Sequence, residues 1–137
     1  MIENLNGIHE TVKYKENSNV KLFINVEVED YPIHWHTPME IIMPLEGSYT
    51  VQIGDDLVHL NESDIIFIAS GVKHRLIAPD TGKRLILQIE WSAVSKIKEL
   101  NSILTLIAPA ITLTPETSGN IPVSYTHLRA HETLRHL

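Results

Sequence analysis

The sequence contains no cysteine, which excludes disulfide bonds, thiolate nucleophiles and zinc sites built from cysteine ligands. It also lacks any run of about eighteen apolar residues, so we expect no helix that spans a membrane. The first residues have neither the basic stretch nor the apolar stretch of a signal peptide. Together these absences favour a cytoplasmic protein with no membrane association.

Positive charge is scarce, because 11 Lys and Arg face 17 Asp and Glu and the formal net charge is −6. Proteins that bind DNA neutralise its phosphates with clustered basic side chains. We therefore expect that this chain does not bind DNA on its own. Its 137 residues suit one compact domain.

Short segments of alternating apolar and polar residues follow one another from about residue 19 to residue 91. In residues 21–29, Leu22, Ile24 and Val26 lie on one face, which is typical of a half-buried strand. Turn residues, such as those at 54–56, separate the segments at roughly ten-residue intervals. The pattern predicts an all-β fold, either a sandwich or a barrel.

Helical periodicity occurs only after the last predicted strand. Apolar residues recur at helical spacing from Val94 to Ile107, and Pro109 ends the pattern. We expect one helix of about three turns here. Residues 114–116 resemble the start of a second helix, with a hydroxyl cap, a proline and an acid.

The last residues, PVSYTHLRAHETLRHL, differ in composition from the rest and hold three of the eight histidines. The stretch 123–133 resembles the translated sequence of an adapter used in sequencing libraries. We therefore expect residues 122–137 to be a non-native tail. The pair His127 and His131, although spaced for metal binding on a helix, then has no function.

One group of polar residues has metal-binding chemistry. His34 and His36 share a face of a strand, and Glu40 has the same parity. His74 lies between apolar residues of another predicted strand. Three imidazoles and one carboxylate suit Fe, Mn, Ni or Zn and leave coordination positions open for water or a ligand. The alternative is a hydrogen-bonded polar patch that binds no metal.

The spacing of these residues resembles the two motifs of the cupin family. The pattern HxHx3Ex6G, which begins at residue 34, is similar to the first motif. The pattern Gx2H, which begins at residue 71, is similar to the end of the second motif. Some framework positions differ, such as Val28 where a glycine is expected. The resemblance implies a double-stranded β-helix, a jelly-roll-like barrel, over residues 21–91. An N-terminal arm over residues 1–20 would precede the barrel, and a short C-terminal helix would follow it.

The longer stretch from Tyr31 to Pro115 resembles the N-terminal effector-binding and dimerisation domain of AraC-type transcription regulators. In such regulators, dimerising helices and then a double helix-turn-helix domain that binds DNA follow the barrel. The resemblance implies that residues 92–121 hold a helix and the start of a truncated dimerisation or linker region. It also implies that the DNA-binding domain is missing from this chain.

Two functions are therefore open. The first is ligand sensing without catalysis, in which a sugar-like or other small polar effector binds in a pocket of the barrel. The expected pocket residues are His34, His36, Glu40, His74 and Gln88. Gln88 lies opposite an apolar strand face, so a solvated position fits it equally well. The full-length regulator would be a homodimer that contacts DNA only through its helix-turn-helix domain.

The second function is that of a small stand-alone metal enzyme, an isomerase or a dioxygenase. It would use His34, His36, Glu40 and His74 as ligands of a divalent metal. A complete ligand set supports this function, whereas the resemblance to regulators and the helix after the barrel support the first.

Overall fold

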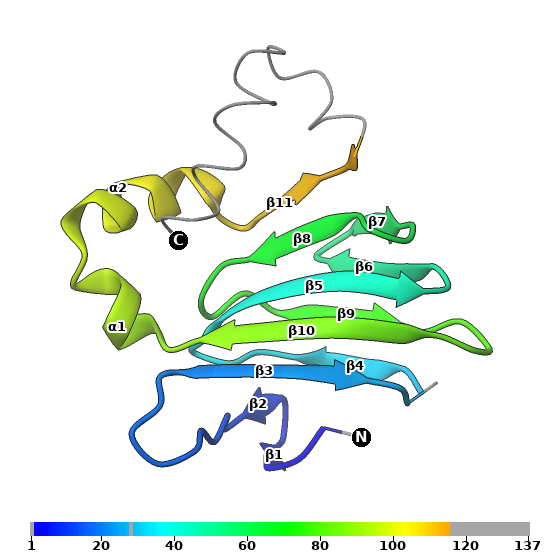
Figure 1. Cartoon of the computed structure of the whole chain (residues 1–137), viewed down its shortest axis with the longest axis horizontal. Helices are drawn as coiled ribbons and strands as arrows, with labels where there is room; N and C mark the ends of the chain where they lie inside the picture. The colour runs from blue at the N-terminus through cyan, green and yellow to red at the C-terminus, as the bar shows by residue number, and fades with distance from the viewer. Residues whose placement is uncertain (1, 28, 116–137) are drawn as a thin grey trace.

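A computed structural model describes residues 2–27 and 29–115 (Figure 1). In chain order, the elements are β1 (Leu5–Asn6), β2 (His9–Glu10), β3 (Val20–Asn25), β4 (Tyr31–His34), β5 (Met39–Glu46), β6 (Tyr49–Ile53), β7 (Asp56–Leu60), β8 (Ile65–Ile68), β9 (His74–Ile77), β10 (Lys83–Ile89), α1 (Trp91–Ser95), α2 (Lys98–Ile107) and β11 (Ala110–Leu113). The predicted tail, residues 122–137, and most of the predicted second helix lie outside the described residues.

Two antiparallel sheets form the barrel. One has five strands in the order β11-β8-β5-β10-β3, and the other has four in the order β4-β9-β6-β7. Figure 1 shows the five-stranded sheet in front, with the helices at one end and the hairpin of β1 and β2 beside β3. The all-β fold and the jelly-roll-like barrel predicted from the sequence are confirmed.

The hydrophobic core lies between the two sheets, and each sheet contributes half of its fully buried apolar side chains. The five-stranded sheet contributes Ile42, Ile66, Ile68 and Ile86, and the four-stranded sheet contributes Tyr49, Val51, Leu60 and Leu76. Burial of one such aliphatic side chain stabilises the fold by about 1.5–3 kcal/mol. The polar site described below lies between the same two sheets, with His34 and His74 on one and Glu40 and Gln88 on the other.

A buried arginine extends this core. Arg84 has no exposed surface, and its guanidinium lies 4.6 Å from the ring centroid of Tyr31 and 5.2 Å from that of Tyr49. Its Nη1 donates a 3.3 Å hydrogen bond to the carbonyl oxygen of Glu27. The two aromatic faces replace part of the hydration that the charge loses on burial.

The half-buried strand expected over residues 21–29 is present as β3, but its apolar face points out of the barrel. Leu22 is 62% exposed and Ile24 is 57% exposed, whereas Phe23 and Asn25 face inward. Alternation shows that the two faces of a strand differ. Which face is buried depends on the register with β10, where Arg84 lies opposite Asn25.

The apolar face of β3 continues across the whole sheet. The cross-strand pairs Leu22–Leu87, Leu87–Ile41, Ile41–Phe67 and Phe67–Ile111 make one row over all five strands. We call this surface the outer apolar face; it consists of Val20, Leu22, Ile24, Ile41, Met43, Ile65, Phe67, Leu85, Leu87, Ile111 and Leu113. All of these side chains are exposed or half-buried.

The region after the barrel differs from the prediction in two ways. The single expected helix is divided into α1 and α2, because Ile97 has an extended backbone with φ −90° and ψ 105°. After α2 the chain returns to the barrel, where β11 pairs with β8. Apolar periodicity cannot reveal such a change of direction, since Ile97 keeps the helical spacing. In the part of the chain that is described, neither helix has the length and apolar character to traverse a bilayer.

Candidate metal centre

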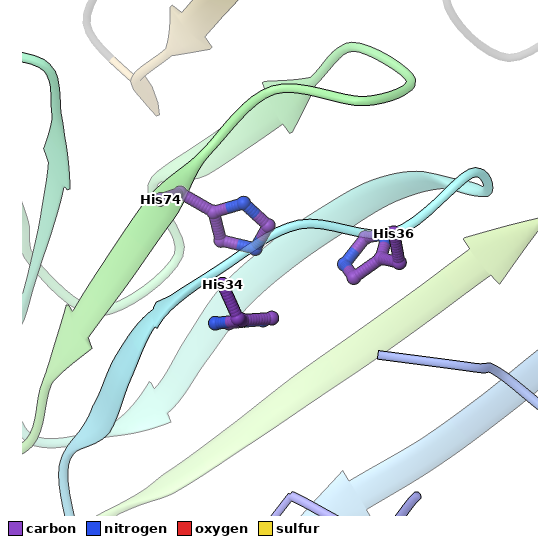
Figure 2. A group of neighbouring side chains, drawn as sticks. All are labelled: His34, His36 and His74. Atoms are coloured by element: carbon purple, nitrogen blue, oxygen red, sulfur yellow. The ribbon is translucent and has the colours of Figure 1, made fainter. Parts of the chain in front are cut away.

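Three buried imidazoles meet inside the barrel. His34 ends β4 and lies opposite His74, the first residue of β9, while His36 lies in the turn that leads into β5. One ring nitrogen from each histidine lies within 4.8 Å of those of the other two. Figure 2 shows the three rings directed toward one another. We refer to His34, His36 and His74 as the three-histidine cluster.

Backbone carbonyls hold the three rings in the same tautomer. Each Nδ1 atom lies within hydrogen-bond distance of the backbone oxygen of a residue two positions away. The distances are 2.7 Å from His34 to Pro32, 2.9 Å from His36 to Pro38 and 2.8 Å from His74 to Val72. A carbonyl oxygen only accepts hydrogen bonds, so each Nδ1 carries a proton. In a neutral ring, Nε2 is then left with a lone pair.

Glu40 places its carboxylate against two of these Nε2 atoms. Its Oε2 lies 3.0 Å from Nε2 of His74, and its Oε1 lies 3.5 Å from Nε2 of His36. Glu40 is 5% exposed. Neutral rings would therefore direct lone pairs at carboxylate oxygens, which is repulsive unless a proton or a metal cation lies between them.

The residues fit a divalent metal. His36 Nε2 is buried and has no hydrogen-bond partner among the described residues, so a ligand atom is free at the centre of the cluster. Metal-binding histidines commonly donate their second ring N–H to a backbone carbonyl, as all three do here. Three imidazoles and a carboxylate suit Fe, Mn, Ni or Zn.

Burial and charge set the protonation of the cluster. Burial and the neighbouring His74 ring lower the pKa of His34 to about 4. Burial also opposes charge on His36, but the Glu40 carboxylate outweighs burial and raises the pKa of this histidine. For Glu40, burial is outweighed by the His36 and His74 rings, which hold the pKa of its carboxyl well below the usual range. Glu40 is therefore an anion that a proton on His36, or a cation, can neutralise.

Gln88 lies in the pocket, at the position of β10 opposite Glu40. It is 3% exposed, and its Nε2 donates a 2.9 Å hydrogen bond to Glu40 Oε1. The structure thus brings together all five residues expected to line the pocket and removes Gln88 from solvent. His59 lies apart from them, exposed on β7.

The pocket next to the cluster has a volume of about 310 Å³. It lies between β3 and β4, the edge strands of the two sheets, and its lining includes Asn25, Tyr31, His34, Glu40 and Gln88. The N-terminal arm contributes Ile2, Glu3, Asn4, Glu10 and Thr11. The remaining lining residues are Lys21, Phe23, Ile24, Val26, Glu27 and Ile86.

Glu10 also lies at the cluster, although no pattern in the sequence predicted it as a site residue. Its Oε1 lies 3.7 Å from Nε2 of His34, and its side chain is 13% exposed. Burial raises the pKa of its carboxyl and outweighs the opposing effect of the nearby His36 ring. Glu10 is separated from the first cupin-like motif by a long segment, and no local pattern in the arm indicates that it reaches the barrel.

Comparison with known proteins agrees with this geometry. The family model described as "Cupin domain" matches residues 23–89, which include the three-histidine cluster, Glu40 and Gln88. The chain is also similar to the uncharacterized HTH-type transcriptional regulator YdeC of Bacillus subtilis (strain 168), with 34% identity over 55 residues. The match covers 39% of this chain and 19% of that protein, so this chain spans a small part of the regulator.

Solved structures show the same fold. A cupin-2 domain containing protein from Shewanella frigidimarina NCIMB 400 has a TM-score of 0.50 at 19% identity, covering 56% of this chain and 76% of that one. The conserved protein SPY1581 of Streptococcus pyogenes has a TM-score of 0.50 at 14% identity, and the match covers 55% of this chain and 68% of that one. Residues 23–89 of this chain match the cupin domain model, and the chain has the cupin fold of two stacked antiparallel sheets.

Proposed function

We propose that this chain is the effector-binding and dimerisation domain of an AraC-type transcription regulator. The observation that supports this best is the similarity to an HTH-type transcriptional regulator, in a chain whose barrel has a polar pocket. Such a regulator works in the cytoplasm and contacts DNA through a helix-turn-helix domain that lies outside these 137 residues. In this proposal the cupin barrel binds a ligand and has no catalytic role.

The pocket lining indicates the class of effector. About 310 Å³ accommodates a small molecule. The amide oxygen of Gln88, the phenol of Tyr31, the ammonium of Lys21 and the carboxylate of Glu10 offer both donors and acceptors of hydrogen bonds. A sugar-like or other small polar compound matches this lining.

A divalent metal held by the three-histidine cluster and Glu40 belongs to the same proposal. A bound Fe, Mn, Ni or Zn ion would supply a positive charge that attracts an oxygen atom of the effector. Gln88 orients the carboxylate of Glu40, and the three backbone carbonyls orient the imidazoles. These contacts preorganise the site before the effector binds.

Strand β10 connects the pocket to the helices. Gln88 hydrogen-bonds to Glu40, and only Ile89 and Glu90 separate it from Trp91, the first residue of α1. Glu90 N also donates to the carbonyl of Asn19, just before β3. A ligand that displaces Gln88 would therefore shift the start of α1, which is how effector binding would reach the rest of a regulator.

A second copy of the chain is the partner that we propose for the outer apolar face. Large contiguous apolar patches are rare on monomers. Five of its side chains, Val20, Leu22, Ile24, Ile111 and Leu113, are between 38% and 62% exposed. All of its side chains are uncharged, so two negatively charged copies can approach there without opposing like charges.

Metal content and ligand-induced stabilisation test the proposed function. We expect about one equivalent of metal in the purified chain by elemental analysis, the same in His59→Ala, and almost none in His36→Ala. A panel of sugars and small polar acids should include a compound that raises Tm without being consumed. Equal, near-zero metal in all three proteins would contradict the metal site, and the absence of any stabilising compound would contradict the sensor.

The alternative is a metal-dependent isomerase or dioxygenase, and the complete set of three histidines and Glu40 favours it. A cupin fold alone does not assign an activity. The same panel distinguishes the two functions, because an enzyme converts a compound that it binds, whereas a sensor releases it unchanged. Product analysis by mass spectrometry after incubation with the metal-loaded chain gives the answer.

A further inference from the structure

The N-terminal arm is attached at the mouth of the pocket by a few specific contacts. Trp35 N donates a 2.8 Å hydrogen bond to the carbonyl of Ile8, and Glu10 N donates a 2.9 Å bond to the carbonyl of Trp35. The ring of His9 stacks on that of Trp35 with 4.2 Å between centroids. Consecutive side chains of a strand point in opposite directions, so with His9 on Trp35, Glu10 points at the cluster.

Glu10 gives the third imidazole a carboxylate of its own. Glu40 faces Nε2 of His36 and of His74, while Glu10 Oε1 lies 3.7 Å from Nε2 of His34. Because His34 donates its Nδ1 proton to Pro32, its Nε2 lone pair faces the Glu10 carboxylate. Every imidazole of the cluster thus lies against an acceptor oxygen.

The charges of this arrangement favour a divalent cation. With neutral imidazoles, Glu10 and Glu40 bring a formal charge of about −2 into a space where their side chains are only 13% and 7% exposed, and Lys21 of the pocket lining offsets part of the charge of Glu10. Two carboxylates buried near each other destabilise the fold unless a counter-ion is present. A divalent cation matches this charge, and it also accepts the Nε2 lone pairs.

We propose that Glu10 is a further carboxylate ligand of the cation held by the three-histidine cluster and Glu40, so that the bound cation fastens the N-terminal arm over the pocket. This rests on the metal site of the proposed function. It differs from the first cupin-like motif because the ligand comes from the arm, outside the matched residues 23–89. The arm then becomes a part of the site whose attachment depends on the metal.

Cobalt provides a direct probe of this ligand. Co²⁺ added to the metal-free chain should give a visible spectrum that depends on coordination number and ligand type. We expect Glu10→Gln to change this spectrum and to weaken Co²⁺ affinity by about tenfold or more. Glu3→Gln is the matched control, since Glu3 lies in the same arm and lines the same pocket. It should retain the spectrum and affinity of the unmodified chain.

Amide hydrogen exchange tests whether the cation fastens the arm. In the unmodified chain, Co²⁺ should slow exchange at residues 8–11, and in Glu10→Gln it should leave these residues unchanged. A Glu10→Gln variant with the original spectrum and with metal-dependent protection of the arm would overturn the inference, even if its affinity were lower. If the unmodified chain binds no Co²⁺, both the metal site and this inference fail.

Discussion

Gln88 lies directly opposite Glu40 on the neighbouring strand and donates a 2.9 Å hydrogen bond to its Oε1. This contact leaves the other oxygen of Glu40 against His74. An amide that donates to one carboxylate oxygen limits the rotation of the whole group. Gln88 is therefore a positioning residue for the proposed metal ligand.

Gln88→Leu should weaken metal affinity by about 10–100-fold, because Glu40 loses the donor that orients it. It should also lower the free energy of unfolding by about 1–3 kcal/mol, since a buried acceptor is left unpaired. Gln52→Leu is the matched control, because the Gln52 side chain makes an exposed 3.2 Å bond to the carbonyl of Gly54. Calorimetric titration with Zn²⁺ and urea unfolding measure the two effects; equal values for both variants would contradict the role of Gln88.

The metal-free chain should lose stability as pH falls from about 6.5 to about 4. Burial and His74 lower the pKa of His34 to about 4 in the folded protein, whereas an unfolded histidine titrates near 6.5. Between these values the unfolded chain binds a proton that the folded chain does not. The contribution of neutral His34 to the free energy of unfolding is therefore complete above pH 6.5 and is lost as the pH falls toward 4. After allowance for solvent screening, we expect a loss of about 2 kcal/mol.

Urea unfolding in EDTA at several pH values measures this loss. His36 acts in the opposite sense, because its raised pKa stabilises the fold at low pH and the contribution disappears as pH rises through that pKa. The comparison must therefore be made between variants. His34→Gln should show a smaller loss between pH 6.5 and 4 than His59→Gln, and identical pH profiles would argue against a neutral, buried His34.

Gly47→Ala should destabilise the barrel by about 1–3 kcal/mol. Gly47 has φ +80°, and a Cβ atom there would lie 2.8 Å from the carbonyl oxygen of Thr81. Gly54→Ala is a control with a similar φ of +60° but open space around the added atom. This control should lower the free energy of unfolding by about 1 kcal/mol, because only the unfavourable backbone conformation contributes. Thermal and urea unfolding measure both, and a Gly47 variant no less stable than the Gly54 variant would refute the steric argument.

Leu22→Glu should convert a dimer of this chain into a monomer. Leu22 lies in the central row of the outer apolar face, so a charge there would be buried without a partner in the proposed interface. Leu57→Glu is the control, since Leu57 is 65% exposed on the four-stranded sheet. Sedimentation equilibrium should show a dimer for the original chain and for the control. A monomeric original chain would contradict the proposed partner.

Local patterns were sufficient for the fold class and for part of the site. Alternation and turn residues predict an all-β barrel, and the structure confirms it. The parity of His34, His36 and Glu40 predicts that they share a face, since side-chain direction along a strand depends only on spacing. The same alternation could not show that Leu22 points outward or that Ile97 interrupts the helix, because both depend on what packs against the element.

The sequence by itself therefore determined periodicity, turns and the types of ligand atoms. Only the tertiary structure decided which distant residues meet. His74 joins His34 through the pairing of β9 with β4, Gln88 reaches Glu40 through the register of β10 with β5, and Glu10 reaches the cluster through the contact of the arm with Trp35. Pairing between strands depends on the mutual fit of both faces of two sheets, and no single segment contains that information.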